Sequence, residues 1–357
     1  MAKKPSALHE IKGVSQPETT SALSTAKIKQ YRNKKNSVEE FVHHILKGNI
    51  PFLSKAITLV ESTNPKHQEK ANEIIEKCLP FANNAVRIGI TGVPGVGKST
   101  FIEAYGKHLT SQGKKVAVLA VDPSSSVNKG SILGDKTRME QLVTDPNAFI
   151  RPSPAGSSLG GVAQKTRESI ILCEAAGFDT IIIETVGVGQ SETVVHSMVD
   201  FFLLLNLAGA GDELQGIKRG IIEMADAIVI NKSDGENEKN AKIAQVEFNR
   251  ALHLYPLKES NWQPKVLTAS ALNYKGIDVV DAMIQEYIAL TKQNGYFAEK
   301  RNEQNKFWLL STIDRQLKDA FYQNPQIQKL LSNEIQQLEA GKTTPFLAAK
   351  RLLGKDS

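Results

Sequence analysis

The sequence is poor in cysteine and in long apolar runs. Cys78 and Cys173 are the two cysteines among its 357 residues, and their wide spacing fits neither a metal knuckle nor a redox pair. We interpret both as small buried apolar side chains and expect a reducing compartment, the cytoplasm. The longest apolar run, residues 199–208, is interrupted by polar residues and is too short to cross a bilayer. The sequence therefore predicts a protein without a membrane span.

The body of the chain also lacks a net charge. The whole sequence carries +6, and residues 1–36 alone hold eight Lys or Arg and two Glu. This basic, Ser- and Thr-rich tail is expected to be disordered. Because the remaining chain is neutral, its charge does not favour a nucleic-acid partner. An organelle transit peptide is a weaker alternative, since such peptides are rich in Arg and poor in acids.

The spacing of apolar residues divides the rest of the chain into three parts. Residues 37–83 have helical spacing and predict an N-terminal helical segment. Residues 84–293 alternate continuous apolar runs with helix-length connections, which predicts an α/β domain with a mainly parallel sheet of about six or seven strands. Residues 294–357 carry apolar stripes typical of two amphipathic helices, the second starting after Pro325.

A phosphate-binding loop follows the first apolar run of the α/β region. The stretch "GVPGVGKST", residues 92–100, fits the pattern G-x-x-x-x-G-K-[ST] between a strand and a helix. Glycines let main-chain N–H groups surround phosphate oxygens, Lys98 can reach the β- and γ-phosphates, and Ser99 can offer its hydroxyl to magnesium. The predicted phosphate-binding residues are Gly92, Val93, Pro94, Gly95, Val96, Gly97, Lys98, Ser99 and Thr100.

Two later stretches indicate which nucleotide base is bound. A strand ends in "NKSD", residues 231–234, where the carboxylate of Asp234 can accept hydrogen bonds from the ring N–H and the exocyclic amine of guanine, a donor pair that adenine lacks. "TASAL", residues 268–272, ends the next strand and suits contact with the guanine oxygen. The predicted base-binding residues are Asn231, Lys232, Asp234, Ser270, Ala271 and Leu272. The sequence thus predicts a P-loop GTPase that binds GTP and GDP.

Another apolar strand ends on a carboxylate. In "IIIETVGVGQSE", residues 181–192, Glu184 stands where many GTPases carry the Asp of D-x-x-G, beside the phosphates and magnesium. Asp122 and Asp135 are two further acids in a position to serve the metal. Val188 occupies the place where small signalling GTPases carry a water-orienting Gln, so we assign no general base.

Together these stretches resemble one family, the methylmalonyl-CoA mutase-associated GTPases. The most restrictive of them are "GDKTRM" at 134–139, "ETVGVGQSE" at 184–192 and "GDELQGIKRG" at 211–220, and the likeness spans roughly residues 38–350. The resemblance implies a homodimer, joined by the C-terminal arm, that acts as a chaperone for an adenosylcobalamin-dependent acyl-CoA mutase.

The resemblance also implies roles for individual residues. Lys98 and Glu184 would serve GTP hydrolysis, and Lys218 would belong to a switch segment that responds to the mutase. The magnesium shell or its surroundings would be formed by Ser99, Asp122, Asp135 and Glu184.

Other functions remain open to a domain of this type. A GTPase that inserts nickel or cobalt into enzymes would usually carry a Cys- or His-rich loading site, and this sequence offers only the pair His43 and His44. A protein kinase of a transport system would require net phosphoryl transfer to a protein. A purely structural scaffold conflicts with the complete set of phosphate, magnesium and guanine elements.

Overall fold

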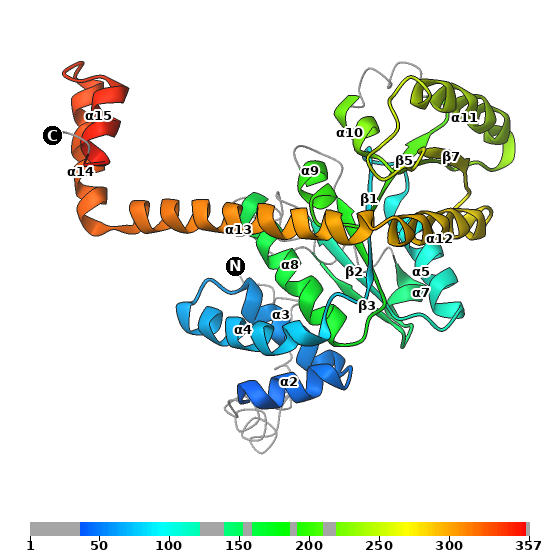
Figure 1. Cartoon of the computed structure of the whole chain (residues 1–357), viewed down its shortest axis with the longest axis horizontal. Helices are drawn as coiled ribbons and strands as arrows, with labels where there is room; N and C mark the ends of the chain where they lie inside the picture. The colour runs from blue at the N-terminus through cyan, green and yellow to red at the C-terminus, as the bar shows by residue number, and fades with distance from the viewer. Residues whose placement is uncertain (1–35, 122–138, 153–158, 186–190, 210–218, 355–357) are drawn as a thin grey trace, which may run out of the picture.

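A computed structural model describes residues 36–121, 139–152, 159–185, 191–209 and 219–354 of the chain (Figure 1). These residues form an α/β domain with helices added at both ends. Within them, no helix is long and apolar enough to cross a membrane.

The centre of the molecule is one parallel sheet, which confirms the predicted fold class. Among the described residues it has seven strands in the order β3-β2-β4-β1-β5-β6-β7. Their bounds are β1 Val86–Gly92, β2 Val116–Val121, β3 Ala148–Arg151, β4 Thr180–Thr185, β5 Phe201–Leu207, β6 Ala227–Asn231 and β7 Lys265–Thr268. The central strands are buried along nearly their whole length, as continuous apolar runs require. The short edge strand β3 has no such run, and the apolar pattern did not indicate it.

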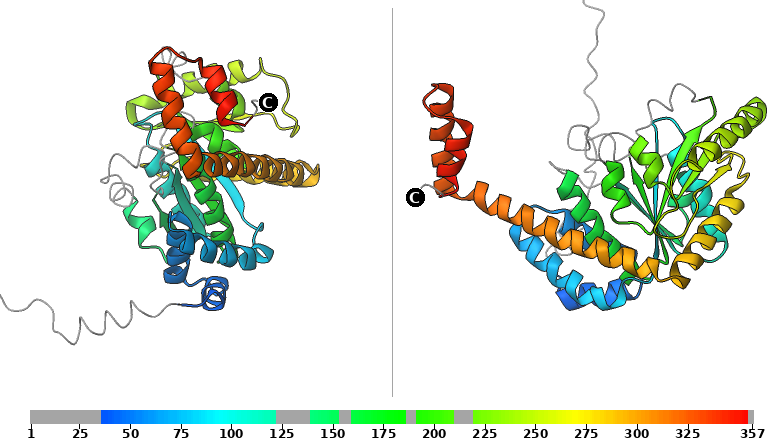
Figure 2. Two further views of the ribbon diagram at one scale, coloured as in Figure 1. Left: turned by 90° about the vertical axis from the view of Figure 1, so that its left-hand side faces the viewer. Right: turned by 45° about the horizontal axis from the view of Figure 1, so that its top comes forward.

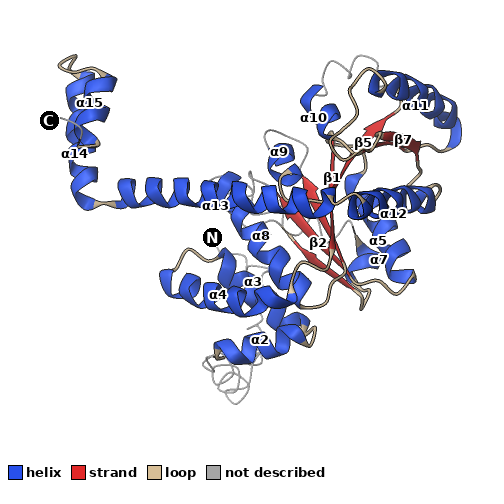
Figure 3. Ribbon diagram, in the orientation of Figure 1, coloured by secondary structure: helices blue, strands red, loops and turns tan. Residues whose placement is uncertain are grey.

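Helices cover both faces of the sheet (Figure 3). Ile88, Val118 and Ile182 point to one face, which is covered by α5 Lys98–Ser111, α7 Glu140–Val143 and α12 Ile277–Gln293. Ala117, Ile181 and Ile183 point to the opposite face. The helices on that face are α8 Leu159–Ala175, α9 Ser191–His196, α10 Arg219–Met224 and α11 Glu238–Leu252.

The predicted N-terminal helical segment consists of three short helices. Their bounds are α2 Val38–Leu46, α3 Ile50–Glu61 and α4 Pro65–Cys78, followed by a 3₁₀ turn η1 Leu79–Phe81. Side chains of Ser37, Asn49 and Asn64 accept hydrogen bonds from main-chain N–H groups in the first turn of each helix, which fixes where each one starts. The segment packs on α8, so it extends the core of the α/β domain.

The C-terminal arm leaves the α/β domain as one long helix (Figure 2). The arm consists of α13 Tyr296–Gln323, α14 Pro325–Glu339 and α15 Pro345–Leu352. The third helix was not predicted, because α15 has only eight residues and offers too few turns for a periodic pattern. Beyond its first turns α13 is largely exposed, including its large apolar side chains Phe307, Leu309, Leu310, Ile313, Leu317 and Tyr322.

Arg301 anchors this arm to the sheet. Its Nε and Nη2 donate to the two carboxylate oxygens of Asp200 at 2.8 and 2.7 Å. Its guanidinium also donates to the carbonyl oxygens of Asn83 and Ala85, just before β1. Because this side chain satisfies carbonyls and a buried carboxylate at once, the arm root is fixed where β1 and β5 begin.

Candidate functional site

The phosphate loop lies at the carboxyl end of the central strand. Gly92 ends β1, and a Cβ at this position would lie 2.5 Å from the carbonyl oxygen of Leu205. Gly97 caps α5 with a left-handed φ of 93°, and its Cβ would lie 2.9 Å from Nδ2 of Asn231. The two glycines therefore let the loop pass close to its neighbours and place the N-terminus of α5 at the end of β1.

Lys98 is the first residue of α5 and is largely buried at this end of the sheet. Its ammonium donates to the carbonyl oxygens of Gly92 at 2.7 Å and Val93 at 3.3 Å. Burial lowers the pKa of Lys98, and the carboxylates of Glu184 and Glu192 counteract this effect. The lysine is thus held inside the loop with two negative side chains near it.

Ser99 and Glu184 meet beside the loop. The Ser99 hydroxyl donates to Oε1 of Glu184 at 3.3 Å, and Glu184 is 8% exposed. A hydroxyl next to a carboxylate is a donor set that suits Mg²⁺. The neighbouring Thr185 donates its own hydroxyl hydrogen to Oγ1 of Thr91 at 2.8 Å, which ties the end of β4 to the end of β1.

The residues predicted for the base lie at the end of β6 and in the loops that follow β6 and β7. Asn231 donates from Nδ2 to the carbonyl oxygen of Val96 at 2.9 Å, and Lys232 donates from Nζ to that of Gly95 at 2.8 Å. These bonds join the phosphate loop directly to the "NKSD" stretch.

The loop after β7 contacts the "NKSD" stretch. Ser270 donates its hydroxyl hydrogen to Oδ2 of Asp234, which fixes one carboxylate oxygen and orients the other. The N–H of Ala271 donates to Oδ1 of Asn231 at 3.3 Å. Leu272 is 74% exposed and lies at the margin of this arrangement.

Several predicted residues lie outside the described ranges. They are Asp122, Asp135 and Lys218. Within the described ranges no group of three or more His, Cys, Asp or Glu side chains could hold a metal. The structure therefore brings together Ser99 and Glu184 of the predicted magnesium residues, and the roles of the other two remain predictions.

The sequence analysis gave no role to two buried polar residues near this site. Glu192 is 4% exposed and Asn206 is fully buried. Oε2 of Glu192 and Nδ2 of Asn206 have no hydrogen-bond partner in the part of the chain that the structure describes. Glu192 stands inside the quoted "ETVGVGQSE" stretch, but only the packing of α9 reveals that its side chain is buried.

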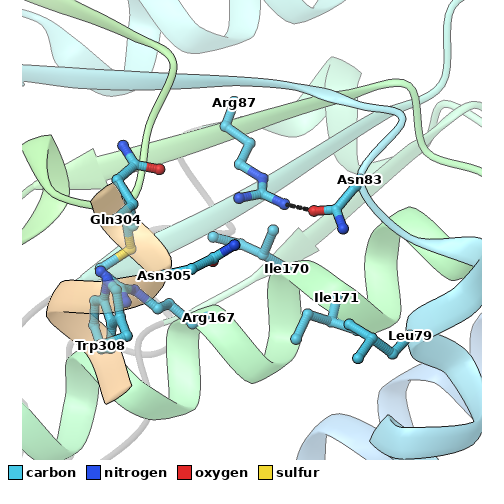
Figure 4. A pocket seen from close by; sticks show the side chains of 10 residues that line it. Leu79, Asn83, Arg87, Arg167, Ile170, Ile171, Gln304, Asn305 and Trp308 are labelled. Carbon is cyan, nitrogen blue, oxygen red and sulfur yellow. Dashed lines mark hydrogen bonds between the residues drawn. The ribbon is translucent and has the colours of Figure 1, made fainter. Parts of the chain in front are cut away.

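A separate cavity lies at the arm root, where β1 begins (Figure 4). It measures about 120 Å³ and is lined by Asn83, Arg87, Arg167 and Trp308, among others. The guanidinium of Arg167 lies against the ring of Trp308 and donates to the carbonyl oxygen of Ser197 at 2.9 Å. Burial and the positive charge of Arg87 lower the pKa of Arg167. This cavity is at the opposite end of β1 from the phosphate loop.

Comparisons with known proteins find relatives that are named GTPases. A sequence model of the family described as "Methylmalonyl Co-A mutase-associated GTPase MeaB" matches residues 53–326. A protein named "Probable GTPase" in Mycobacterium tuberculosis is 49% identical over 86% of this chain and 91% of its own length. The Escherichia coli "GTPase ArgK" is 43% identical over 88% of this chain and 96% of its own.

Two further relatives extend the comparison. The Mus musculus "Methylmalonic aciduria type A homolog, mitochondrial" is 44% identical over 88% of this chain and 79% of its own length. The crystal structure of a "LAO/AO transport system kinase" superimposes with a TM-score of 0.71 and 38% identity, covering 89% of this chain and 96% of the other.

Proposed function

Because the chain belongs to the family of methylmalonyl-CoA mutase-associated GTPases, we propose that it uses GTP to serve as the chaperone of an adenosylcobalamin-dependent acyl-CoA mutase. It would couple GTP hydrolysis to loading of the cofactor into the mutase and to protection of that enzyme. The match of the family over residues 53–326 is the observation that carries this proposal. GTPase activity itself follows from the family and from the relatives named above.

The described side chains support specific roles in GTP binding. Lys98 would contact the β- and γ-phosphates after leaving the carbonyl oxygens of Gly92 and Val93, which it bonds in this structure. Residues 92–97 would surround the phosphates with main-chain N–H groups. Asp234, oriented by Ser270, would accept the two donors of guanine, and the loop at 270–272 would contact the guanine oxygen.

Magnesium would be held by Ser99 and Glu184, with Asp122 and Asp135 as direct or outer ligands. The Ser99–Glu184 contact is the structural observation that fits this set. When bound, the ion would neutralise charge on the phosphate oxygens during hydrolysis. The residues of this chain would hold the nucleotide in place and keep Lys98 and Glu184 at its phosphate end.

The arm would join two copies of the chain. Its exposed apolar side chains continue from α13 onto the next two helices, with Leu330 and Ile335 on α14 and Phe346 and Leu347 on α15. Burial of such a surface against its own copy would give a two-fold symmetric dimer. We propose that residues 294–357 form this dimerisation arm.

A measurement with the mutase tests the chaperone function. Phosphate release would be recorded with and without the acyl-CoA mutase encoded by the same organism, and cofactor transfer would be followed by cobalamin absorbance. We expect stimulation of GTP turnover by at least about tenfold, the scale on which a partner completes a GTPase site. Lys218→Ala should weaken the stimulation and leave turnover without the mutase nearly intact.

The controls separate this proposal from its alternatives. Lys242→Ala removes an exposed lysine from α11 and should leave both rates unchanged. Absent stimulation, together with cofactor loading that is indifferent to GTP, would exclude the chaperone function. Radioactive phosphate that stays on a protein would instead indicate a kinase, and GTP-dependent transfer of nickel or cobalt would indicate metallocentre insertion.

A further inference from the structure

Glu192 is a buried carboxylate, and one of its oxygens lacks a hydrogen-bond donor among the residues that the structure describes. It lies in the first turn of α9 and is 4% exposed. Its Oε2 atom is buried and finds no donor in the described ranges. Because an unpaired carboxylate oxygen is costly to bury, we expect its donor to come from a water molecule or a ligand.

The pairing of the strands shows on which face of the sheet Glu192 lies. A Cβ on Gly89 would contact Val195 of α9 at 3.0 Å, so α9 covers the face to which Gly89 points. Thr91, two residues later on β1, points to the same face. Glu192 precedes Val195 by about one helical turn and is near enough to Lys98 to influence its charge.

Glu184 approaches Lys98 from the other face. It pairs with Ile90, which points toward α5 and α12, and it contacts Ser99 of α5. The two carboxylates that influence Lys98 therefore stand on opposite sides of the sheet. Glu184 lies on the Ser99 side, where magnesium would bind. Glu192 lies on the side covered by α9, where it would bind a different group.

Asn206 provides a second observation at the same end of the sheet. Thr91 pairs with Leu204, and Asn206 follows two residues later, so its side chain points to the face that α9 covers. Its Nδ2 atom is a buried donor without a partner among the residues that the structure describes. Within the described ranges, a donor and an acceptor on one face near the phosphate loop are thus both without partners, as expected around bound water.

We propose that Glu192 orients the water molecule that attacks GTP. Its Oε2 atom would accept a hydrogen bond from that water on the face opposite the Ser99–Glu184 pair. The role suits this chain because Val188 occupies the place where small signalling GTPases have a water-orienting Gln. The inference rests on the proposed phosphate site and adds a residue to it.

The chemical step is balanced without consuming Glu192. The water oxygen forms a bond to the γ-phosphorus, and the bond from that phosphorus to the β,γ-bridging oxygen breaks. Its electron pair remains on GDP. One proton of the water stays in the new hydroxyl group and the other moves to a phosphate oxygen, so the carboxylate only directs the attack.

Glu192→Gln tests the proposal, because it keeps the size of the side chain and removes its charge. In single-turnover hydrolysis we expect the rate to fall by about 100-fold or more, with the Kd for GDP and the KM for GTP within about threefold of wild type. The melting temperature without nucleotide should be unchanged or higher, since a buried carboxylate oxygen that has no donor among the described residues is removed. A structural carboxylate would instead lower the melting temperature and leave the rate per folded molecule intact.

Two other variants keep the result interpretable. Glu174→Gln removes another buried carboxylate, which pairs with Arg87 at 2.8 Å, and it should destabilise the protein without changing the rate of the folded fraction. If Glu192→Gln does not fold, Glu192→Asp keeps the charge and withdraws the oxygens by one methylene, and its rate should fall by at least about tenfold. A wild-type rate in either folded Glu192 variant, or a loss confined to KM, would overturn the assignment.

Lys98→Ala distinguishes a failure of the role given to Glu192 from a failure of the proposed phosphate site. If Lys98→Ala abolishes hydrolysis while Glu192→Gln does not, only the role of Glu192 fails. If Lys98→Ala hydrolyses GTP like the wild type, the phosphate site itself has been placed wrongly.

Discussion

Stability of the fold should fall in mild acid because of His196, at the end of α9. The ring lines a pocket of about 700 Å³ and meets the ring of Phe202 edge-on at 5.4 Å. Burial, followed by the positive charges of Lys300 and Lys258, lowers the pKa of His196 from 6.5 to about 4, although Asp226 opposes the shift. The imidazole is therefore neutral in the folded protein over a range where it is protonated in the unfolded chain.

This difference sets the direction and the size of the effect. The stabilisation is fully present above the unfolded pKa of 6.5 and is lost as the pH falls toward the folded pKa of about 4. One unit of pKa corresponds to about 1.4 kcal/mol. Protonation of His196 in the unfolded chain, and not in the folded protein, should therefore reduce the free energy of unfolding by about 2 kcal/mol between pH 7 and pH 5.

Urea unfolding of the wild type and of His196→Gln across this range measures the effect. Other groups titrate in both proteins, so the difference between the two curves isolates the histidine. The wild type should lose about 2 kcal/mol more than the variant. Curves that run parallel from pH 7 to pH 5 would show that His196 is not kept neutral by its surroundings, and the reasoning from burial would be refuted.

Two further predictions concern the base and the arm. Asp234→Asn should weaken GDP binding by about 100-fold in calorimetry, because two hydrogen bonds to a charged acceptor are disturbed. The variant should also shift the preference toward xanthine nucleotides. Equal affinity of the wild type for ADP and GDP would contradict the guanine assignment. In sedimentation, the full chain should have about twice its mass of 39.1 kDa. The double variant Leu310→Asp and Leu317→Asp, at two positions exposed on α13, should be a monomer, whereas the control Glu303→Gln, also at an exposed position, should remain a dimer. A monomeric wild type at micromolar concentration would argue against the dimer.

Much of the fold followed from the sequence because its central strands are long, apolar and buried on both faces. The runs at 201–207 and 180–185 could be recognised from composition alone. The edge strand β3 could not, since Ala148–Arg151 holds only three apolar residues before a charged one. The equally short β7 was recognised together with the "TASAL" stretch at its end. Residues 148–151 become a strand by pairing with β2, a contact that depends on tertiary structure.

In the candidate site, too, some residues could be predicted from the sequence and others could not. Lys98, Ser99 and Asn231 belong to motifs whose spacing is typical of phosphate- and base-binding loops, so their approximate places could be predicted. Glu192 and Asn206 belong to no spacing rule that we used. Each is buried with one polar atom that has no hydrogen-bond partner in the described part of the chain. This depends on how α9 and β5 pack and is not visible in a linear pattern.

The anchoring of the arm at one end has a mechanical consequence. Arg301, Gln304 and Trp308 bind main-chain or side-chain oxygens between Ser197 and Asp200, the segment that directly follows α9. From Arg301 to Gln323, α13 runs outward for about 33 Å. A rotation of about 5° at its base would therefore displace the far end by about 3 Å. The helix would then act as a lever arm. Small movements of α9 beside the proposed nucleotide site would be magnified at the distant end, where the proposed second subunit would be held.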